Sequence, residues 1–597
     1  MTKVSQIFSF LSPLDRKKLT GLTILQTSLG VLDLIGIAAI GALGALTVTG
    51  VTGAQPGDRV SAALGFLGIE NLSLQAQATW LGAGAGLVLI LKTVLSAFIT
   101  RASLRFLGVK SAEISGSLIS RLLQSDLGVV NSKSKQQHLY ACTTGSNALA
   151  LGILGSLSLL VSDVSLSLLI LAGLLVIDWT LSVATILLFG GVAILVHKFI
   201  SQEAREKGAE IAATTVKSNQ EIVDSLVNFR EIATRGLRNE FSNHLRLTRK
   251  SMSRTYADLT FLPNISKYIV ELTVVFGGLV IGTLQFLRED SVRAVATITL
   301  FIAASARIAP AILRIQQSIV GIRVNLTACE STLELDRSLP PLLKSTDNKR
   351  HNSVIFPELE VSVVNVGIEF PDFQLRNLNF KIPHSSFFAL VGPSGSGKTT
   401  LADLLMGILT PTSGSVFFNE HNAMDLAQIY PGIIGYVPQE VNVIRGTIRE
   451  NVLFGFRKEE FSDDEIWNAL RVASLEDTIR NSSLGLDLVI GDGLSTLSGG
   501  QKQRLGIARA ILTRPRLIVF DEATSSLDAE TEESITQSLE KLRESTSIVM
   551  IAHRLSTVRN ADQIIYLEEG ELRAIGTFAE LRDLIPNFDN QAKLMGL

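Results

Sequence analysis

Two glycine-rich segments in the C-terminal half carry residue types suited to binding a nucleotide. Residues 392–399 read GPSGSGKT and fit the pattern G-x-x-x-x-G-K-[ST], whose backbone N–H groups and lysine surround phosphate groups. The segment follows an apolar strand at 387–391, and a helix is predicted from Thr400, so its N-terminus adds positive potential at the phosphates. The residues expected to contact phosphate are Gly392, Pro393, Ser394, Gly395, Ser396, Gly397, Lys398, Thr399 and Thr400.

The second segment, 497–501, reads LSGGQ and precedes the apolar strand 517–520, which ends in an Asp-Glu pair. Lys398 is expected to reach the β- and γ-phosphates, and the Thr399 hydroxyl to ligate Mg²⁺. Asp521 is placed to hold Mg²⁺ through water, and Glu522 is the predicted general base for the attacking water. The pattern therefore predicts an ATPase that uses ATP and Mg²⁺.

The chain as a whole is too apolar for an ordinary soluble protein. Charged residues make up 18% of the 597 residues, whereas soluble proteins contain about a quarter. Stretches long enough to cross ~30 Å of hydrocarbon occur about six times. They lie near residues 20–50, 78–107, 148–175, 179–200, 261–287 and 294–320. The third and fourth are separated only by a break around 177–179, which predicts a tight helical hairpin.

Lysine and arginine are unevenly distributed between the connections. They concentrate in the N-terminal flank and in the connections 108–145 and 200–258, while the opposite loops contain few of them. This bias predicts that both termini and the ATPase domain face the cytosol, and we expect a bacterial inner membrane. The basic connections are helix-forming in composition, so helices should continue beyond the membrane.

Bulk properties exclude other classes. The net charge of −2 argues against a nucleic-acid partner, which would require an excess of basic residues. Cys142 and Cys329 are far apart in sequence and indicate neither a disulfide framework nor a metal site.

The fold class predicted is multidomain. Residues 1–330 are expected to form an all-α transmembrane domain of six helices with cytosolic extensions, and 331–353, with two prolines and a polar run, a linker. In residues 354–597 apolar strands alternate with helical stretches. This alternation predicts an α/β P-loop ATPase domain with a mostly parallel core sheet.

Residues 354–597 resemble the nucleotide-binding domain of ATP-binding cassette (ABC) transporters, with each hallmark in the family's order. The resemblance implies that Gln439, in the Q-loop, senses Mg²⁺ and that His553 contacts the γ-phosphate, both joining Glu522 in catalysis. It also implies that Phe370 stacks on adenine. The signature and D-loop residues implied to face the nucleotide are Ser498, Gly499, Gly500, Gln501 and Asp528. Residues 491–494, GDGL, depart from the family's G-E-x-G.

The chain contains one phosphate loop and one signature loop. In the family, ATP lies between the phosphate loop of one cassette and the signature loop of another. The resemblance therefore implies a half-transporter that acts as a homodimer, with a heterodimer as the alternative. ATP binding would close the cassettes, and hydrolysis would open them.

Ionisable residues at membrane depth are costly, so they line a cavity or pair with one another. The candidates are Asp33, Lys92, Glu271, Arg307 and Arg314. Arg307 and Arg314 are seven residues apart and share a helix face, and guanidinium groups suit phosphate; together with Lys92 they are the predicted substrate residues. In the alternative reading Asp33, Lys92 and Glu271 neutralise the arginines within the bundle, or Arg314 lies near the cytosolic end and snorkels to the interface.

The segment 306–315 is similar to the flippases for lipid-linked oligosaccharides. That resemblance implies arginines facing the pyrophosphate of a polyprenyl carrier. The leading hypothesis is therefore an ATP-driven exporter of an amphipathic anionic lipid, with a lipid-linked oligosaccharide as the specific candidate.

Two other functions compete with this hypothesis. A general lipid, drug or peptide exporter would favour a cavity rich in aromatic residues, whereas aromatic residues are 6% of the chain. A non-transport cassette protein would be a soluble ATPase, which the apolar spans exclude, or a channel regulator. A channel regulator would be expected to lack Glu522, which is present.

The general-base assignment predicts the behaviour of Glu522→Gln. The variant should lose steady-state hydrolysis by at least about 10²-fold, because the amide cannot accept a proton from water, while ATP binding persists. Phosphate release and nucleotide binding, measured on the purified full-length protein, test this. Turnover near the wild-type rate would show that another group is the base.

Overall fold

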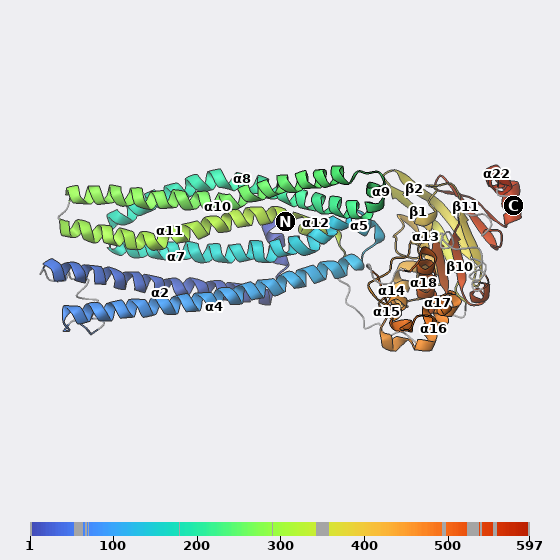
Figure 1. Ribbon diagram of the computed structural model, residues 1–597, viewed down its shortest axis with the longest axis horizontal. Helices are drawn as coiled ribbons and strands as arrows, with labels where there is room; N and C mark the ends of the chain where they lie inside the picture. Colours follow the sequence, from blue (N-terminus) through green and yellow to red (C-terminus); the bar gives the residue numbers. More distant parts are fainter. Residues whose placement is uncertain are drawn as a thin grey trace. The chain divides into compact units, whose positions relative to one another are not determined.

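The computed structural model describes residues 3–52, 64–65, 68–69, 71–177, 179–288, 291–341, 358–491, 497–521, 537, 540–552 and 558–594. These residues form two compact units (Figure 1). The helical unit comprises Met1–Ser125 and Asn131–Leu343, and the cassette unit comprises Asp126–Val130 and Lys344–Leu597. Each unit is described by itself.

Long helices dominate the helical unit, and five of the six predicted apolar stretches each lie within one of them (Figure 1). The stretch 148–175 begins in a π-helical segment and continues in the long helix that follows it. The long helices are α2 (Pro13–Thr52), α4 (Leu74–Leu123), α7 (Gly155–Ile177), α8 (Trp179–Val227), α10 (Arg238–Arg288) and α11 (Ser291–Ala328). Shorter elements of this unit are α1 (Lys3–Ser9), α6 (Lys135–Tyr140), the π-helical η1 (Ala141–Gly145) and η2 (Ala148–Leu154), α9 (Phe229–Thr234) and α12 (Glu330–Ser338). The short helix α5 (Leu127–Asn131) belongs almost wholly to the cassette unit. The predicted break between the third and fourth stretches separates α7 from α8, and Asp178 itself lies outside the described residues.

Five helices in the described part of the chain are long and apolar enough to cross a membrane. They are Pro13–Gly36, Leu74–Leu123, Lys135–Gly173, Ser182–Val227 and Arg238–Leu287. The predicted sixth span, 294–320, lies in α11, where several side chains fall outside the described residues.

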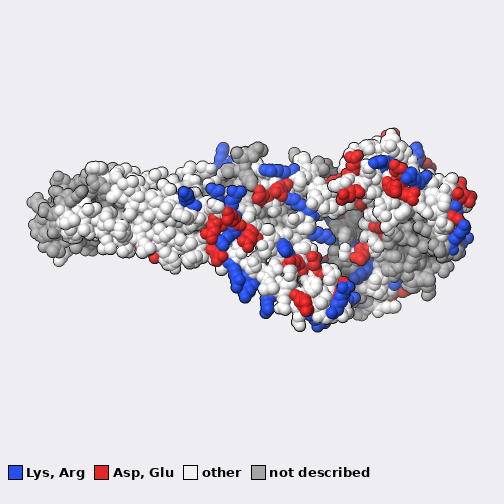
Figure 2. All heavy atoms as spheres, turned by 90° about the horizontal axis from the view of Figure 1, so that it is seen from above, with Lys and Arg blue, Asp and Glu red and all other residues white. Residues whose placement is uncertain are grey.

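The surface of the helical unit matches a hydrocarbon environment at one end. Leu87, Ile194 and Leu279 are exposed by 69%, 73% and 66%, so large aliphatic side chains point outward from three different helices. In Figure 2 the left end of this unit shows almost no lysine, arginine, aspartate or glutamate among the coloured atoms, and these side chains gather farther along the helices. Such a surface is unfavourable in water and favourable in a bilayer.

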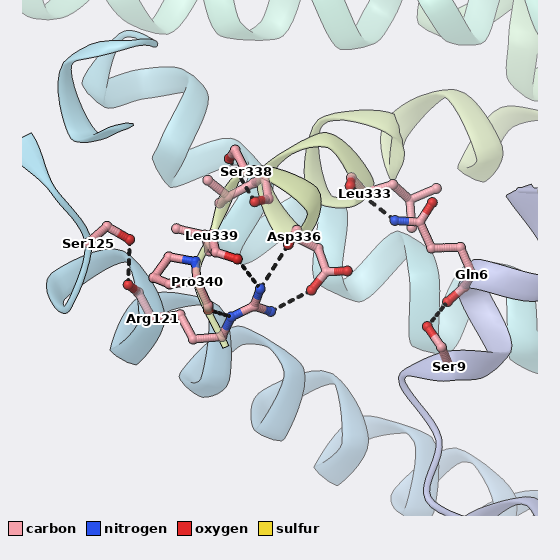
Figure 3. A network of polar contacts seen from close by, with 10 residues as sticks. Gln6, Ser9, Arg121, Ser125, Leu333, Asp336, Ser338, Leu339 and Pro340 are labelled. Atoms are coloured by element: carbon pink, nitrogen blue, oxygen red, sulfur yellow. Dashed lines mark hydrogen bonds and ion pairs between the residues drawn. The ribbon is translucent and has the colours of Figure 1, made fainter. Parts of the chain in front are cut away.

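The C-terminal end of α12 is fixed by one arginine of α4. Arg121 donates to the carbonyl oxygens of Asp336, Leu339 and Pro340 at 2.7–2.8 Å, and it forms an ion pair with the Asp336 carboxylate at 2.5 Å (Figure 3). The last carbonyls of a helix have no partner within the helix, so these bonds act as a C-terminal cap.

The short helix α1 is tied to the same helix. Gln6 donates to the Leu333 carbonyl at 3.2 Å (Figure 3), and its own side-chain oxygen accepts two hydrogen bonds from Arg337 at 3.0 and 2.6 Å. Here the structure differs from the prediction of a linker at 331–353, because residues 331–338 are an anchored part of α12; residues 342–353 lie outside the described residues.

In the cassette unit the described residues form a ten-stranded sheet in the order β5-β4-β1-β2-β12-β11-β3-β10-β9-β6. Strands β11, β3, β10, β9 and β6 are mutually parallel, which confirms the predicted parallel core, whereas β1, β2, β4 and β5 pair antiparallel. The strands are β1 (Val361–Phe370), β2 (Phe373–Ile382), β3 (Phe387–Val391), β4 (Ser413–Phe418), β5 (His421–Asn422), β6 (Ile434–Val437), β9 (Leu517–Asp521), β10 (Ser547–Ile551), β11 (Gln563–Glu568) and β12 (Glu571–Gly576).

Helices cover this sheet, and a two-stranded ribbon of β7 (Gly446–Thr447) and β8 (Val489–Ile490) lies apart from it. The helices are α13 (Lys398–Leu405), α14 (Ala423–Ile429), α15 (Ile448–Leu453), α16 (Asp463–Val472), α17 (Glu476–Arg480), α18 (Gly499–Leu512), α21 (Phe578–Leu584) and α22 (Pro586–Leu594). The predicted glycine loop follows β3, and Asp521 ends β9, so both lie at the carboxyl edge of the parallel strands, where open α/β sheets bind ligands.

Candidate nucleotide site

The loop between β3 and α13 has a backbone that only glycine accommodates easily. Gly392, Gly395 and Gly397 have φ angles of 151°, 79° and 100°. A Cβ atom on Gly397 would lie 2.4 Å from Leu375 Cδ2, and one on Gly392 would lie 2.0 Å from the Leu567 carbonyl oxygen. The loop is therefore a compact backbone turn at the N-terminus of α13, as the phosphate-loop prediction requires.

Two side chains of this loop fit a polyphosphate. Lys398 is 5% exposed, and its Nζ donates to the carbonyl oxygens of Gly392 and Pro393, each at 2.9 Å. The Ser396 hydroxyl is buried and has no hydrogen-bond partner among the described residues. Because buried donors are normally satisfied, phosphate oxygens are suitable acceptors for both groups.

Two carboxylates approach each other beside the loop. Burial, together with the negative charge of Asp521, raises the pKa of Asp403 to about 6. Burial and the same two carboxylates raise the pKa of Tyr436 to about 12, and the Tyr436 hydroxyl hydrogen-bonds to Asp521. Sequence reasoning missed Asp403, although it lies one helical turn after Thr399 on α13.

This local excess of negative charge fits a divalent cation. Carboxylate and hydroxyl oxygens are the donors that Mg²⁺ prefers, and its charge would relieve the repulsion between the two carboxylates. Thr399 and Asp521 would hold the ion, with Gln439, directly after the β6 segment, as the third predicted ligand. Bound there, Mg²⁺ would offset the charge of the phosphates.

The signature segment forms the N-terminus of α18. Ser498 Oγ accepts a hydrogen bond from the Gln501 N–H at 3.3 Å, and Gln501 Oε1 accepts one from the Ser498 N–H at 2.8 Å. This capping box uses the Gln501 side chain within the helix start. Ser498 and Gly499 are exposed, so the positive end of a 14-residue helix faces outward.

Two further side chains of α18 connect the signature helix to the Q-loop segment. Gln503 donates to the Pro438 carbonyl at 3.1 Å. Arg509 donates to the Asn442 carbonyl, the Asn451 carbonyl and Asn451 Oδ1, each at 2.7 Å. Burial lowers the pKa of Arg509 to about 10. The sequence analysis predicted a role for neither residue. For Arg509 a signal was available, because this arginine lies among the apolar positions 505, 508 and 512 of one helix and so could be expected to be buried.

The structure places the remaining predicted residues as follows. Phe370 ends β1 and is 40% exposed, so its ring face is open, and Thr400 lies in the first turn of α13. Glu522, Asp528 and His553 lie outside the described residues, as do residues 492–496. Their roles stay predictions.

The predicted substrate residues lie in the helical unit, and two of their side chains are paired. Lys92 Nζ lies 2.7 Å from Asp33 Oδ2, and Arg314 Nε donates to Asp163 Oδ1 at 2.8 Å. Asp33 therefore pairs with Lys92, and Arg314 pairs with Asp163, a residue that the alternative reading did not name. Glu271 lies 3.9 Å from Lys267 and is exposed, and the Arg307 side chain lies outside the described residues.

Comparisons with known proteins agree with this geometry. Residues 375–525 match the family model described as "ABC transporter". The chain is 39% identical over 252 residues to the "Mitochondrial potassium channel ATP-binding subunit" of Rattus norvegicus, over 41% of this chain and 35% of that protein. It is 28% identical over 428 residues to "ABC transporter B family member 1" of Dictyostelium discoideum, over 68% of this chain and 45% of that protein. The chain thus spans less than half the length of these relatives.

A solved structure matches nearly the whole chain. "Structure of a bacterial Atm1-family ABC exporter with ATP bound" superposes with a TM-score of 0.71 and 20% identity, over 97% of this chain and 99% of that chain. This likeness shows the fold, in which a domain of long helices is followed by a sheet-containing ATPase domain. The cassette unit contains the residues that match the ABC-transporter model and has the fold of an ABC ATPase domain.

The contacts of Arg509 predict that Arg509→Lys is not a conservative change. A lysine ammonium is not planar and cannot donate to the same three acceptors as the guanidinium. The free energy of unfolding should therefore fall by about 2 kcal/mol, a typical value for the hydrogen bonds of a charged group. ATP hydrolysis should fall as well, because α18 would lose its tie to the Q-loop segment. Thermal unfolding and ATPase activity of the full-length variant test this.

The matched control is Arg514→Lys. Arg514 is 79% exposed and lies 3.5 Å from Glu465, so its replacement should change neither property measurably. Equal behaviour of the two variants would contradict the role given to Arg509.

Proposed function

We propose that this protein is an ATP-driven exporter that moves an amphipathic anionic lipid across a membrane. The observation that carries the proposal is the combination in one chain of a phosphate loop, a signature helix and a helical unit with paired cations between apolar helices. The fold, shared with an ABC exporter, supports it. The finer assignment to a lipid-linked oligosaccharide depends on the arginines of α11.

ATP would be held by groups already placed at the carboxyl edge of the sheet. The amides of the glycine loop, Lys398 and the Ser396 hydroxyl would bind its phosphates, and Phe370 would stack on its adenine. Thr399, Asp521 and Gln439 would hold Mg²⁺, and Glu522 would accept the proton of the attacking water. This assignment gives each described group one role in nucleotide binding.

Two copies of the chain would form the working transporter. The N-terminus of α18 faces outward and has hydrogen-bond donors at Gly499 and Gly500, as an anion-binding helix end requires. The phosphate loop of one copy and this helix end of the other would enclose each ATP. A homodimer is the simplest arrangement, and a heterodimer with a related chain would use the same contacts.

Motion would reach the membrane through a short segment that belongs to the cassette unit. Residues 126–130 follow the end of α4 in sequence, and Asp126 Oδ2 accepts a hydrogen bond from the Thr410 N–H at 2.5 Å. The Leu127 N–H donates to the Ile408 carbonyl at 2.9 Å. A displacement of this part of the cassette would therefore be transmitted through the covalent chain to the C-terminal end of α4, which directly precedes residues 126–130.

The substrate would be an anionic lipid because cations lie between apolar helices. Lys92 and Arg314 belong to α4 and α11, and their charges at membrane depth suit a phosphate headgroup whose tail stays in the bilayer. The alternative is a general lipid, drug or peptide exporter. The lysine and arginine distribution supports an orientation with both termini and the cassette in the cytosol, and the membrane we propose is a bacterial inner membrane.

Mixed dimers test the shared ATP sites. One copy carries Lys398→Ala and a first affinity tag, and the other carries Ser498→Arg and a second tag. If each site is built from two chains, one site combines both defects and the other is intact, so purified mixed dimers should occlude nucleotide while both variant homodimers do not. Sites built within one chain would leave both damaged, and mixed dimers without occluded nucleotide would contradict the proposal.

Lipid stimulation of ATPase activity tests the substrate class. In nanodiscs, a polyprenyl pyrophosphate should stimulate the wild type, and the double variant Arg307→Ala/Arg314→Ala should need at least about ten-fold more lipid, because two charge-assisted contacts are lost. Arg246→Ala, an exposed arginine in the charged part of α10, is the control and should respond like wild type. Equal stimulation of wild type and double variant would refute the arginine site.

A further inference from the structure

The two partners of the ion pair between α7 and α11 differ in how far they are buried. Arg314 Nε donates to Asp163 Oδ1 at 2.8 Å, and this bond joins residues 151 positions apart in the chain. The Asp163 side chain is only 9% exposed, whereas the Arg314 side chain is 47% exposed. The carboxylate is therefore fixed inside the helical unit, and the guanidinium reaches from it toward the surface of this unit.

Neither partner uses its full hydrogen-bonding capacity among the described residues. Asp163 Oδ2 is buried and has no hydrogen-bond partner there. Of the Arg314 nitrogens, only Nε has an acceptor in the same part of the chain. A pair whose task is only to join two helices would be expected to bind side by side through two nitrogens and two oxygens. Here the two terminal nitrogens, which form the fork that binds phosphate, are left for another acceptor.

A second pair of opposite charges lies close by. Lys92 Nζ is 2.7 Å from Asp33 Oδ2, and the Asp33 side chain is 2% exposed. The positive charge of Lys92 also acts on the Asp163 carboxylate. The two acids and two bases balance each other, so the protein does not depend on a ligand to compensate these charges within the bilayer.

We propose that Asp163 is a positioning residue for substrate: it holds Arg314 by Nε and thereby presents the terminal nitrogens to the phosphate group of an anionic lipid. This inference rests on the proposed function, and it names a residue of α7 that sets the affinity of the site on α11. Fixing the guanidinium in advance lowers the ordering cost of binding. Asp163 would also compensate the charge of Arg314 between transport cycles, when no substrate is bound. Without this carboxylate, the arginine would be an unpaired charge at membrane depth.

The test uses full-length protein in phosphatidylcholine nanodiscs with increasing fractions of a polyprenyl pyrophosphate. For Asp163→Asn, the lipid fraction that gives half-maximal ATPase stimulation should rise about ten-fold, because a neutral amide holds the guanidinium more weakly than a carboxylate does. The basal rate and the maximal stimulated rate should stay near those of wild type. In the Arg314→Ala background, Asp163→Asn should not change the half-maximal lipid fraction further, since Asp163 acts on the lipid through Arg314.

Two controls separate positioning from packing. Asp258→Asn removes the carboxylate from another interhelical pair, with Lys207 at 2.9 Å, and should leave the lipid response as in wild type. Thermal unfolding identifies a folding defect in any variant, and Asp163→Glu, which keeps the charge, should recover part of the lipid affinity.

The outcomes distinguish this inference from the proposed function. No stimulation of the wild type would overturn both. A stimulated wild type with an unchanged half-maximal lipid fraction in Asp163→Asn would overturn only the role of Asp163. The same conclusion would follow if basal and stimulated rates fell equally, or if the effect persisted in the Arg314→Ala background. In a final experiment, inorganic pyrophosphate is supplied without the lipid. If it stimulates ATPase activity with the same dependence on Asp163, the positioning role of Asp163 would stand, but a lipid would be excluded as the required ligand.

Discussion

Charge placed away from water must be compensated nearby, and this constraint explains the contacts of the buried charged groups in both units. Between the apolar helices, Lys92 and Arg314 each face a buried carboxylate. In the cassette, Lys398 is buried against the carbonyl oxygens of its own loop. Where compensation is incomplete, as between Asp403 and Asp521, the pKa of Asp403 rises instead. Incompletely compensated groups therefore mark the positions where a ligand contributes most.

The same constraint explains how segments that are distant in the sequence are joined. A buried guanidinium requires several acceptors, and Arg509 finds them in the Q-loop segment and at Asn451. A displacement of the Q-loop segment therefore displaces α18 and the signature residues at its start. Arg121 plays a similar part in the helical unit, where its bonds fix the end of α12 (Figure 3). The hydrogen bonds that satisfy Arg509 and Arg121 therefore also hold together segments that are far apart in the sequence.

Sequence reasoning recovered the elements of this fold more fully than the contacts between them. The strands at 387–391 and 517–520 and the long apolar helices were predictable, because strand length, apolar periodicity and glycine loops are local signals. The anchoring of α12 was not predictable, since it depends on Arg121, which lies more than two hundred positions away.

The residues of the candidate site also divide into those that a local sequence pattern predicts and those whose role depends on distant partners. The loop residues 392–399 follow a local pattern, whereas Asp403 and Arg509 acquire their importance only from partners in other elements. Asp163 is a clear example, because an isolated acid in an apolar segment does not reveal which helix supplies its partner.

The cations of the two units differ in how they can receive an anion. Two acceptors of Lys398 are the neutral carbonyl oxygens of Gly392 and Pro393, and phosphate oxygens can replace these two without leaving a buried carboxylate uncompensated. The acceptor of Arg314 is a buried carboxylate, and breaking that contact would leave a charge whose cost is typically about 3–5 kcal/mol. An anionic headgroup therefore gains more by binding the terminal nitrogens than by displacing Asp163. The geometry of the pair, with only Nε engaged, allows this addition, and on release Arg314 would remain compensated for the next cycle.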